Sequence, residues 1–466
     1  MSKAGTSRLV VVSNRVALPR VDQATTGGLA VALRTALSKC GGVWFGWDGR
    51  KVVKPPAEPR RVIRDGVEYV TLPLVTRDYD EYYQGFANRV LWPLMHYRLA
   101  LLHYRRRFYE GYRRVNAWFA GYLTELLQPG DSLWVHDYHF VPMAAELRAR
   151  GFEGAIGFFL HTPFAPLDIL RSMPPHREFL HWLAAYDLLG FQTELDRHAF
   201  LDAVRLDIGA RVGARGVVEL GGRRVATGAF PIGADVSEIR AQVVRGRRSR
   251  ELADFKESLE GKRLVIGADR LDYSKGLVER CQAYRYLLAS HPELHGEIVY
   301  LQVAEPSRTE VPEYQEVQRA LDQMAGEITG EFARFDWMPM RYLNHRMRRA
   351  TLLAFLSVAR VALITPLRDG MNLVAKEFIA AQNPSDPGVL VLSEMAGAAR
   401  QLDAALLVNP YDIEGIGDAI AEALAMPLAE RQRRFERLYE VVSHNDIHAW
   451  GERFLEALAQ TRREVS

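Results

Sequence analysis

The sequence has few cysteines, no long apolar run and almost no net charge, and each shortage excludes a class of protein. Cys40 and Cys281 are its two cysteines, far apart and outside any CxxC pair, which argues against a disulfide framework and a zinc knuckle. No window reaches the ~18 uninterrupted apolar residues of a membrane-spanning helix. The first residues contain no apolar signal core. These features predict a protein of the reducing cytoplasm that has no membrane partner.

The charges balance along the chain. With 60 basic and 57 acidic residues the net charge is +3, so any basic binding site has to be local. Residues 97–114 are rich in arginine and tyrosine, a composition that nucleic-acid-binding segments can share. This composition is better explained by helices in which the alkyl part of each arginine covers apolar surface, so we expect no nucleic-acid partner.

Several catalytic motifs are also missing. The chain has no GxGxxG after a strand, no GxxxxGK[ST] and no GxSxG, which argues against a nicotinamide or flavin enzyme, a P-loop ATPase and an α/β-hydrolase. Asp78-Tyr79-Asp80 has the DxD shape of metal-dependent sugar transferases. Three residues match too easily, and we expect them in a charged loop far from a strand end. The prediction is therefore no metal and no cofactor.

What the chain does contain is an alternation of short apolar runs and helical patterns. The runs lie at residues 9–12, 133–135, 156–160, 188–191, 264–266, 298–301, 361–364, 389–392 and 406–408. Helical patterns at 277–289 and 314–324 separate some of them. Strands that alternate with helices indicate βαβ units. We predict an α/β protein of two Rossmann-like domains, each a doubly wound parallel sheet, facing a central cleft.

The alternation is interrupted once, at residues 234–261. A chain of 466 residues is too long for one core. We therefore expect an N-terminal domain of residues 1–233 and a C-terminal domain of residues 234–445. A last helix within residues 446–466 is expected to pack back on the N-terminal domain.

Polar and charged residues gather directly after the predicted strands. They form the segments SNR (13–15), HDYH (136–139), HTPF (161–164), DRLDYSKG (269–276), EPSR (305–308) and TPLRDGMN (365–372). Ligands bind beyond the carboxyl ends of the strands in α/β sheets. Six loops rich in polar and charged residues at these strand ends therefore predict one ligand-binding cleft.

The C-terminal loops suit a nucleoside diphosphate that departs during a reaction. Arg270 and Lys275 can hold a diphosphate and stabilise it as it leaves. The helix that begins near residues 370–372 offers free N–H groups to a phosphate. Glu377 can accept hydrogen bonds from ribose hydroxyls, and Gly27-Gly28 lets the backbone approach a ligand closely.

Other residues indicate a second ligand with its own phosphate. Arg15 and Arg308 come from different strand ends and can clamp that phosphate. A sugar ring can hydrogen-bond to a carboxylate through its hydroxyls and stack its apolar face on aromatic rings. Asp137 offers the carboxylate, and Trp47, Tyr83 and Trp92 offer the rings.

With these loops in place, the chain resembles the trehalose-6-phosphate synthases, retaining GT-B glycosyltransferases of family 20. The resemblance runs from about residue 8 to about residue 450. It rests on LVVVSNR (9–15), GGLA (27–30), WFGW (44–47), DEYY (80–83), VLWP (90–93), WVHDYH (134–139), GFFLH (157–161), DLLGFQT (187–193), RLDYSKG (270–276) and TPLRDGMNLVAKE (365–377).

The resemblance implies an activity. Glucose would pass from a nucleotide-diphosphate glucose, UDP-glucose by default, to glucose 6-phosphate, giving α,α-trehalose 6-phosphate. The acceptor would attack the face from which the diphosphate leaves, so the anomeric configuration is retained and no protein nucleophile is needed. This fits the absence of a paired-carboxylate or Ser/His/Asp motif.

The resemblance also implies roles for single residues. The donor site would comprise Gly27, Gly28, Arg270, Lys275, Met347 (through its backbone, beside the base), Leu373, Val374, Ala375, Lys376 and Glu377. The acceptor pocket would comprise Arg15, Tyr83, Trp92, Asp137 and Arg308. The catalytic residues would be His161, Arg270, Lys275 and Asp369, of which His161 and Asp369 contact the transferred sugar. Asp272 is expected to fix its loop, and capping of the next helix is the alternative role of Asp369.

Three other functions stay open. A glucosylglycerol-phosphate synthase would keep the donor loops and alter the acceptor pocket. A regulator on an inactive transferase scaffold would bind sugar phosphate without turnover, and a pseudo-glycosyltransferase would join cyclitols. The donor base, whether uridine, adenosine or guanosine, does not show in the sequence. The expected partners are the two small-molecule substrates, further copies of the chain in a dimer or tetramer, and a phosphatase that acts on the product.

Overall fold

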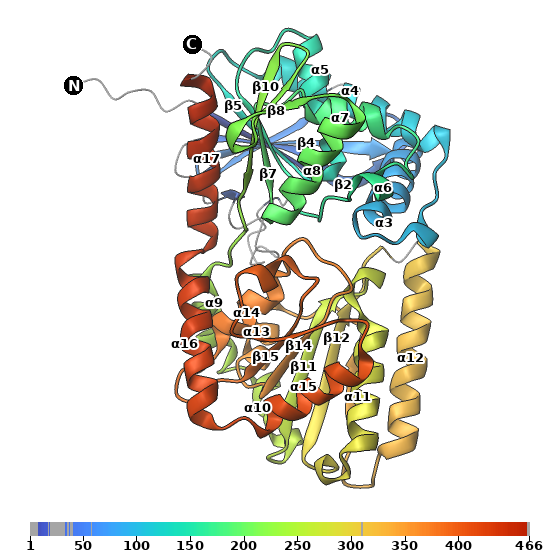
Figure 1. Ribbon diagram of the computed structural model, residues 1–466, viewed down its shortest axis with the longest axis vertical. Coiled ribbons are helices and arrows are strands. Elements are labelled where there is room, and N and C mark those ends of the chain that lie inside the picture. The colour runs from blue at the N-terminus through green and yellow to red at the C-terminus, as the bar shows by residue number, and fades with distance from the viewer. Residues whose placement is uncertain are drawn as a thin grey trace, which may run out of the picture. The chain divides into compact units, whose positions relative to one another are not determined.

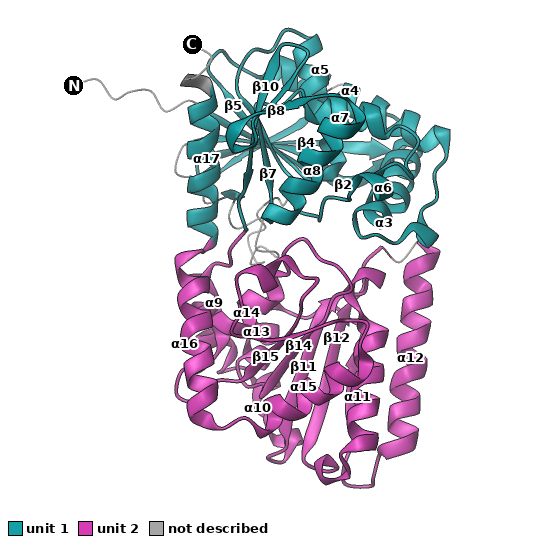
Figure 2. Ribbon diagram, in the orientation of Figure 1, with its two compact units in different colours: residues 1–231, 447–466 teal, residues 232–446 magenta. Residues whose placement is uncertain are grey.

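The computed structural model describes residues 8–16, 18, 33–34, 37, 41–56, 58–308 and 311–463. The chain forms two compact units, each with its own sheet and core (Figure 2). The first unit comprises Met1–Pro231 and Ile447–Ser466, and the second comprises Ile232–Asp446. The predicted α/β class is confirmed, since both units combine a largely or wholly parallel sheet with many helices.

The first unit is built on a ten-stranded sheet in the order β3-β4-β2-β1-β5-β6-β7-β10-β9-β8 (Figure 1). Its strands are β1 (Leu9–Arg15), β2 (Gly42–Val52), β3 (Arg60–Arg64), β4 (Val67–Val75), β5 (Ser132–His136), β6 (Ile156–Phe159), β7 (Leu188–Phe191), β8 (Arg211–Val212), β9 (Val218–Leu220) and β10 (Arg223–Ala229). The strands from β4 to β10 pair in parallel, whereas β3, β8 and β9 are antiparallel additions at the two edges.

The central strands of this sheet are buried along almost their whole length. Every residue of β6 and β7 is buried, which requires cover on both faces of the sheet. The described helical segments of the unit are α2 (Thr76–Asp78), η1 (Tyr79–Leu91), α3 (Trp92–Met95), η2 (Leu99–Leu101), α4 (Arg106–Leu126), η3 (Tyr138–Phe140), α5 (Met143–Ala149), α6 (Leu167–Leu170), α7 (His176–Leu183), α8 (Glu194–Asp207), η4 (Ala214–Gly216) and α17 (Ile447–Arg463).

The last helix, α17, packs on the sheet of the first unit although the whole second unit separates them in sequence. Trp450 and Phe454 are buried, and the Phe454 ring stacks on Trp134 with 4.7 Å between ring centroids. Gly157 and Gly190 make room for that ring, since a Cβ on either would lie 2.8 or 2.7 Å from it. The two glycines of β6 and β7 thus form the surface on which α17 packs.

The second unit has a six-stranded parallel sheet in the order β13-β12-β11-β14-β15-β16. Its strands are β11 (Arg263–Arg270), β12 (Ile298–Glu305), β13 (Met340–Leu343), β14 (Val361–Ile364), β15 (Val389–Ser393) and β16 (Leu406–Val408). The helical segments are α9 (Val236–Gly246), α10 (Arg250–Leu259), η5 (Tyr273–Lys275), α11 (Leu277–Ser290), η6 (Pro292–Leu294), α12 (Pro312–Phe332), α13 (Arg349–Leu356), α14 (Leu373–Ala381), η7 (Gly397–Arg400), α15 (Ile413–Ala425) and α16 (Leu428–His444).

The strand orders create one topological switch point in each sheet. In the first unit the chain winds outward from the neighbouring strands β1 and β5, and in the second unit from β11 and β14. Loops that follow such neighbours diverge, and ligands of α/β sheets bind where they part. The loops after β1, β5, β11 and β14 carry the SNR, HDYH, DRLDYSKG and TPLRDGMN segments.

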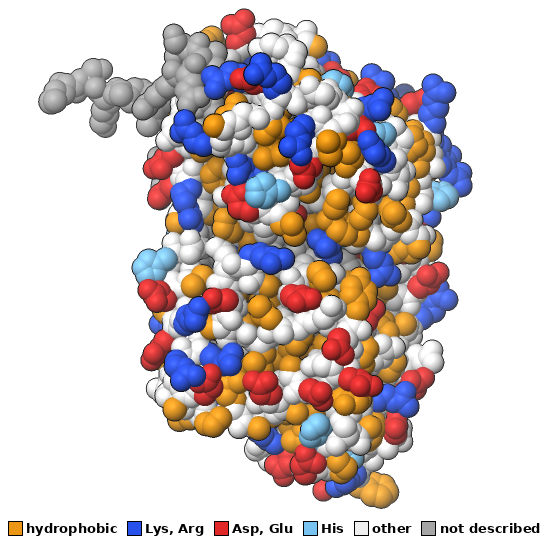
Figure 3. All heavy atoms as spheres, viewed as in Figure 1, with side chains coloured by type: hydrophobic (Ala, Val, Ile, Leu, Met, Phe, Trp, Pro, Cys, Tyr) orange, Lys and Arg blue, Asp and Glu red, His pale blue; other side chains and the backbone are white. Residues whose placement is uncertain are grey.

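Part of the arginine-rich stretch at residues 97–114 is paired with acidic side chains. Arg114 contacts both Asp78 and Glu81, at 2.5 and 2.8 Å, and Arg113 lies 3.8 Å from Glu178. On the face visible in Figure 3, basic and acidic side chains are interspersed. No helix within the described ranges has the length and hydropathy needed to cross a membrane.

Candidate functional site

The loop after β11 is folded into a tight turn that places Lys275 beside the end of β14. Asp272 starts the turn by accepting a hydrogen bond from the Ser274 backbone N–H at 3.0 Å. Gly276 ends it with φ +63°, and a Cβ there would lie 2.3 Å from the Thr365 carbonyl oxygen. Only glycine combines this backbone conformation with so close an approach. The sequence therefore brings the two loops of the switch point into contact.

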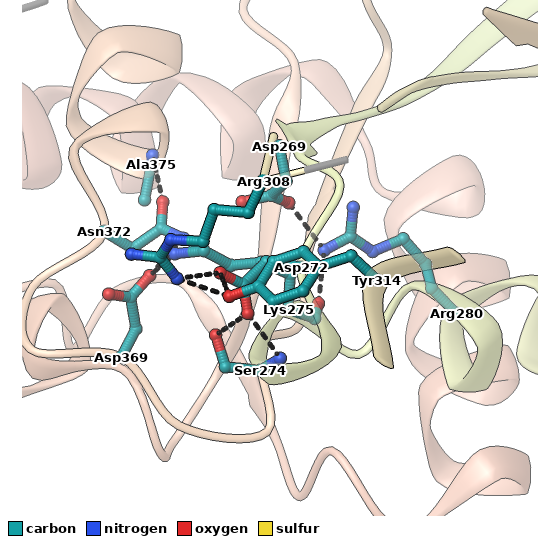
Figure 4. A network of polar contacts seen from close by, with 10 residues as sticks. All are labelled: Asp269, Asp272, Ser274, Lys275, Arg280, Arg308, Tyr314, Asp369, Asn372 and Ala375. Carbon is teal, nitrogen blue, oxygen red and sulfur yellow. Dashed lines mark hydrogen bonds and ion pairs between the residues drawn. The ribbon is translucent and has the colours of Figure 1, made fainter. Parts of the chain in front are cut away.

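Lys275 and Asp369 meet across this contact, from loops 94 residues apart (Figure 4). The Lys275 ammonium donates to Asp369 Oδ2, which also accepts from Asn372 Nδ2 at 3.0 Å. Both partners of the ion pair are largely buried, with exposed side-chain fractions of 10% and 14%. A cation, a carboxylate and an amide thus converge at one point beside the start of α14.

Asn372, and not Asp369, caps α14. Its Oδ1 accepts from the Ala375 backbone N–H at 3.2 Å, and its φ of 76° lies in the left-handed region that asparagine tolerates. The alternative reading of Asp369 as the helix cap is therefore wrong. Leu373 and Val374 form the first turn of α14, where backbone N–H groups and the helix dipole favour a phosphate.

The side chains farther along α14 are bound within the second unit. Glu377 is buried and accepts from Arg349 at 2.7 Å. Burial raises the pKa of its carboxyl group, and Arg349 opposes that rise. The Lys376 ammonium donates to the Ile232 carbonyl and to Gln401 Oε1, each at 2.7 Å. Lys376 therefore ties α14 to the start of the unit.

Arg270 is exposed at the carboxyl end of β11, next to a fully buried ion pair. That pair joins Asp269 to Arg280 of α11 at 2.9 Å, and Arg280 also donates to the Lys275 carbonyl at 3.2 Å. Removing one partner of such a pair leaves an uncompensated buried charge, at a cost of about 3–5 kcal/mol. Arg280 thus fixes the loop that carries Arg270 and Lys275.

Two further predicted residues follow strands of the second sheet, Arg308 after β12 and Met347 after β13. Met347 is half-buried, and its backbone N–H donates to Glu305 Oε1 at 3.2 Å. Arg308 has a φ of 48°, uncommon for a residue with a side chain. Its guanidinium donates to the Tyr314 hydroxyl and lies 3.5 Å from Asp272 Oδ2.

In the first unit, Arg15 and Tyr83 both pack against one tryptophan, Trp47. The Arg15 guanidinium lies 4.9 Å from the centre of the Trp47 ring, and Tyr83 lies 5.2 Å from the same ring. Tyr83 also stacks on His139 at 6.0 Å. Gly49, with φ +87°, leaves the space that the guanidinium occupies. Trp47 is buried, so its ring contacts these two residues and very little solvent.

Asp137 and His161 lie at the ends of the adjacent strands β5 and β6. Asp137 has φ 71°, a strained conformation of the kind found at functional sites. Its Oδ1 accepts from the His161 backbone N–H at 3.3 Å. The His161 ring is hydrogen-bonded to His136, with 3.1 Å between Nε2 and Nδ1. Burial lowers the pKa of His161 to about 3 and that of His136 well below its usual value, so both rings are neutral near pH 7.

Two sequence-based expectations change on this structure. Trp92 is only 6% exposed and packs against Tyr138 and His96, so little of its ring is open to a ligand. Asp78-Tyr79-Asp80 is helical and not a loop, since it spans the end of α2 and the start of η1. Asp78 is paired with Arg114. Within the described residues, no group of three or more His, Cys, Asp or Glu side chains could hold a metal ion.

Gly27 and Gly28 lie outside the described residues. Of the others, the second unit brings Lys275 and Asp369 together beside the start of α14. The first unit groups Arg15 with Tyr83, and Asp137 with His161. Reasoning from sequence missed Arg280, Tyr314 and the capping role of Asn372. Of these three, only the capping role of Asn372 could have been predicted from the sequence, because an asparagine directly before a helical pattern is typical of an N-cap.

The residues at the switch point of the second unit can neutralise a departing diphosphate. Two cationic side chains and a helix start converge at the second switch point. The nearby carboxylates are held by Lys275, Arg280, Arg308 and Arg349. The chemistry that fits is transfer of a group from a diphosphate, with the protein supplying position and charge.

Comparison with known proteins identifies the family. The family model described as glycosyltransferase family 20 matches residues 7–460. A trehalose-6-phosphate synthase of Klebsiella pneumoniae is 47% identical over 458 residues, covering 97% of this chain and 95% of its own length.

Two solved structures are similar to this chain over almost its whole length. An α,α-trehalose-phosphate synthase (UDP-forming) from Burkholderia xenovorans, in complex with glucose 6-phosphate, is 43% identical with a TM-score of 0.93 and covers 97% of this chain and 100% of its own. An E. coli protein bound with UDP-2-fluoro glucose is 45% identical with a TM-score of 0.93 and covers 97% and 99%. The predicted GT-B fold is thereby confirmed, and the chain belongs to glycosyltransferase family 20.

Proposed function

We propose that this chain is a trehalose-6-phosphate synthase, which transfers glucose from UDP-glucose to glucose 6-phosphate and releases UDP. The observation that carries the proposal is the meeting of Lys275 and Asp369 beside the N-terminus of α14. It is supported by relatives of 43% and 45% identity, one in complex with glucose 6-phosphate and one bound with UDP-2-fluoro glucose.

The donor diphosphate binds Lys275, Arg270 and the first turn of α14. Lys275 leaves its ion pair with Asp369 as the diphosphate arrives, because one ammonium exchanges a carboxylate for a phosphate. Asp369 is then available to a hydroxyl of the transferred sugar, still held by Asn372. These positive groups perform the charge neutralisation for which other transferases use a metal, so we propose that no metal is required. We propose that the donor site of the second unit also includes Met347, Ala375, Lys376 and Glu377. Gly27 and Gly28, which the sequence predicts as donor-binding, lie outside the described residues.

Transfer proceeds on one face of the sugar. As the bond from the anomeric carbon to the diphosphate oxygen breaks, the acceptor hydroxyl bonds to that carbon on the same face and gives its proton to a phosphate oxygen. His161 contacts the transferred sugar as a neutral ring, held by His136 and by the turn at Asp137. No covalent enzyme intermediate forms.

In the first unit we propose Arg15, Tyr83 and Asp137 as acceptor-binding residues, with Trp92 near them. In the second unit we propose Arg308. A guanidinium fork matches the geometry of a phosphate, which favours Arg15 and Arg308 as phosphate ligands. Asp137 accepts from sugar hydroxyls.

The test is release of nucleoside diphosphate with UDP-, ADP- or GDP-glucose as donor and glucose 6-phosphate or glycerol 3-phosphate as acceptor. We expect UDP release that depends on glucose 6-phosphate, with trehalose 6-phosphate detected by mass spectrometry. Release only with glycerol 3-phosphate would instead indicate a glucosylglycerol-phosphate synthase. Tight binding of sugar phosphate with no release from any pair would indicate a regulator. The homo-oligomer, the phosphatase partner and the cytoplasmic location stay predictions.

A further inference from the structure

Asp272 is a fully buried carboxylate that shapes the loop of Lys275. Its exposed fraction is 0%. Oδ1 accepts from the Ser274 backbone N–H and from the Ser274 hydroxyl, each at 3.0 Å, and the Asp272 carbonyl accepts from the Lys275 N–H at 3.1 Å. One oxygen of this carboxylate is thus committed to the turn that presents Lys275 (Figure 4).

The other oxygen of Asp272 faces Arg308. Oδ2 accepts from the Tyr314 hydroxyl at 3.1 Å and lies 3.5 Å from Arg308 Nη1. The same Arg308 nitrogen donates to the Tyr314 hydroxyl. The phenol therefore stands between the carboxylate and the guanidinium and hydrogen-bonds to both.

Burial suits Tyr314 to this position. The side chain is 0% exposed, and burial raises its pKa well above the usual value, so the hydroxyl keeps the proton that it donates to Asp272. The Tyr314 ring packs against Tyr273 of the same turn, with 5.2 Å between ring centroids. Tyr314 thus contacts the turn through both its ring and its hydroxyl.

Arg308 depends on these partners for its position. Its φ of 48° is unfavourable for a side-chain-bearing residue and persists only where the surroundings hold it. Its side chain is 9% exposed, so the guanidinium is largely enclosed. A shift of the turn on binding a diphosphate at Lys275 would move Asp272, and Arg308 would follow.

We propose that Asp272 and Tyr314 are positioning residues that join the loop of Lys275 to Arg308, so that the donor diphosphate and the acceptor phosphate strengthen each other's binding. This inference rests on the proposed function, in which Lys275 binds the first phosphate group and Arg308 the second. Coupling of this kind is reciprocal, so each ligand tightens the other by the same factor.

The experiment measures binding of UDP by calorimetry to the full chain, with and without saturating glucose 6-phosphate. The coupling factor is the ratio of the two dissociation constants, and couplings between sites are typically about 5- to 150-fold. Tyr314→Phe removes the connecting hydroxyl and keeps the ring. We expect the factor to fall to about one, and KM for glucose 6-phosphate to rise about tenfold while KM for UDP-glucose changes less.

Tyr284→Phe is the matched control. Tyr284 is also 0% exposed in the second unit, and its hydroxyl donates to the Pro339 carbonyl at 2.9 Å, away from the Asp272 turn. It should leave the coupling factor unchanged. A double-mutant cycle adds Arg308→Ala, after which Tyr314→Phe should cause no further rise in KM, because Tyr314 acts through Arg308.

The outcomes separate the two proposals. If the parent chain releases no UDP with glucose 6-phosphate, the proposed function itself fails. If the parent is active and Tyr314→Phe keeps the coupling factor of Tyr284→Phe, the inference is overturned. If Tyr314→Phe does not fold, Asp272→Asn is measured in its place, and a retained coupling factor in that variant equally overturns it.

Discussion

Lys275 is the side chain on which the proposed chemistry most depends, because its ammonium meets the departing diphosphate. Lys275→Ala should lower kcat for UDP release about 10²- to 10³-fold, as expected when one group that stabilises developing charge is lost. Initial rates at saturating substrates measure this. Lys256→Ala, at an exposed position of α10 in the same unit, is the control and should retain the parent rate. A near-normal kcat in Lys275→Ala would exclude the role.

The buried histidines make stability depend on pH. An unfolded histidine has a pKa of about 6.5, whereas burial lowers that of His161 to about 3 and lowers that of His136 also. Below about pH 6.5 the unfolded chain therefore binds protons that the folded chain does not, and stability falls as the pH falls.

His136→Phe should weaken this loss of stability, by up to about one proton, as the pH is lowered below about 6.5. The free energy of unfolding, measured in denaturant across that range, reports the slope. His198→Phe, at an exposed position of α8, is the control. An unchanged slope in His136→Phe would mean that His136 is not buried as a neutral ring.

Single residues were predictable where chemistry follows a strand. Arg270 and Lys275 follow a predicted strand, so their residue types and positions suggested a diphosphate site, whereas the role expected for Asp369 came from the family resemblance. Tyr314 and Arg280 gave no such signal, because each lies within a helical pattern. The partner of Tyr314 is 42 residues away, and the pattern of a helix does not show which distant carboxylate one of its side chains meets.

At the scale of elements, the start of α14 is the part of the fold that the site uses most directly. Asn372→Gly removes the cap and the bond to Asp369 without backbone strain, since glycine accepts the φ of 76°. It should cost a few tenths of a kcal/mol of stability and raise KM for UDP-glucose about tenfold through the loss of Asp369's support.

Asp412→Gly is the matched variant for this helix cap. Asp412 caps α15 in the same unit by accepting from the Gly415 N–H at 2.9 Å. Thermal unfolding and steady-state kinetics should show a similar small loss of stability in both variants. Only Asn372→Gly should change KM, and equal kinetics in the two would remove α14 from the donor site.

Strands that read as continuous apolar runs were predicted well, and the other strands were not. Every apolar run that the sequence offered is a strand in the structure, because parallel strands covered on both faces read as continuous apolar residues. The runs named from the sequence did not include β2, β3, β4, β8, β9, β10 or β13. Of these, β3, β8 and β9 are short antiparallel strands at the two ends of the first sheet. β3 is largely exposed and has three arginines among its five residues. Residues 234–261, which gave no clear pattern, form α9 and α10.

At the scale of the whole molecule, the chain leaves the first unit after Pro231 and returns to it at Ile447. Phe454→Ala should therefore destabilise the first unit, by about 3–5 kcal/mol for a buried aromatic residue. Hydrogen exchange should show loss of protection in β6 and β7 and unchanged protection in β11 and β12.

Phe435→Ala on α16 is the reciprocal variant, because Phe435 is buried in the second unit. Its loss of protection should appear in the second unit. If Phe454→Ala instead loosened the second unit, the assignment of α17 would be wrong. The sequence predicted that the last helix packs on the N-terminal domain, but not that it packs on Gly157 and Gly190, because the space these glycines leave is recognised only once Phe454 is seen to fill it.

The central claim is that glucose passes to glucose 6-phosphate with its anomeric configuration retained. The most direct measurement is nuclear magnetic resonance of the product made from UDP-glucose labelled with ¹³C at the anomeric carbon. We expect UDP and a disaccharide phosphate whose labelled carbon has the α configuration in a 1,1-linkage. A labelled carbon in the β configuration, or a product formed only with another acceptor, would contradict it.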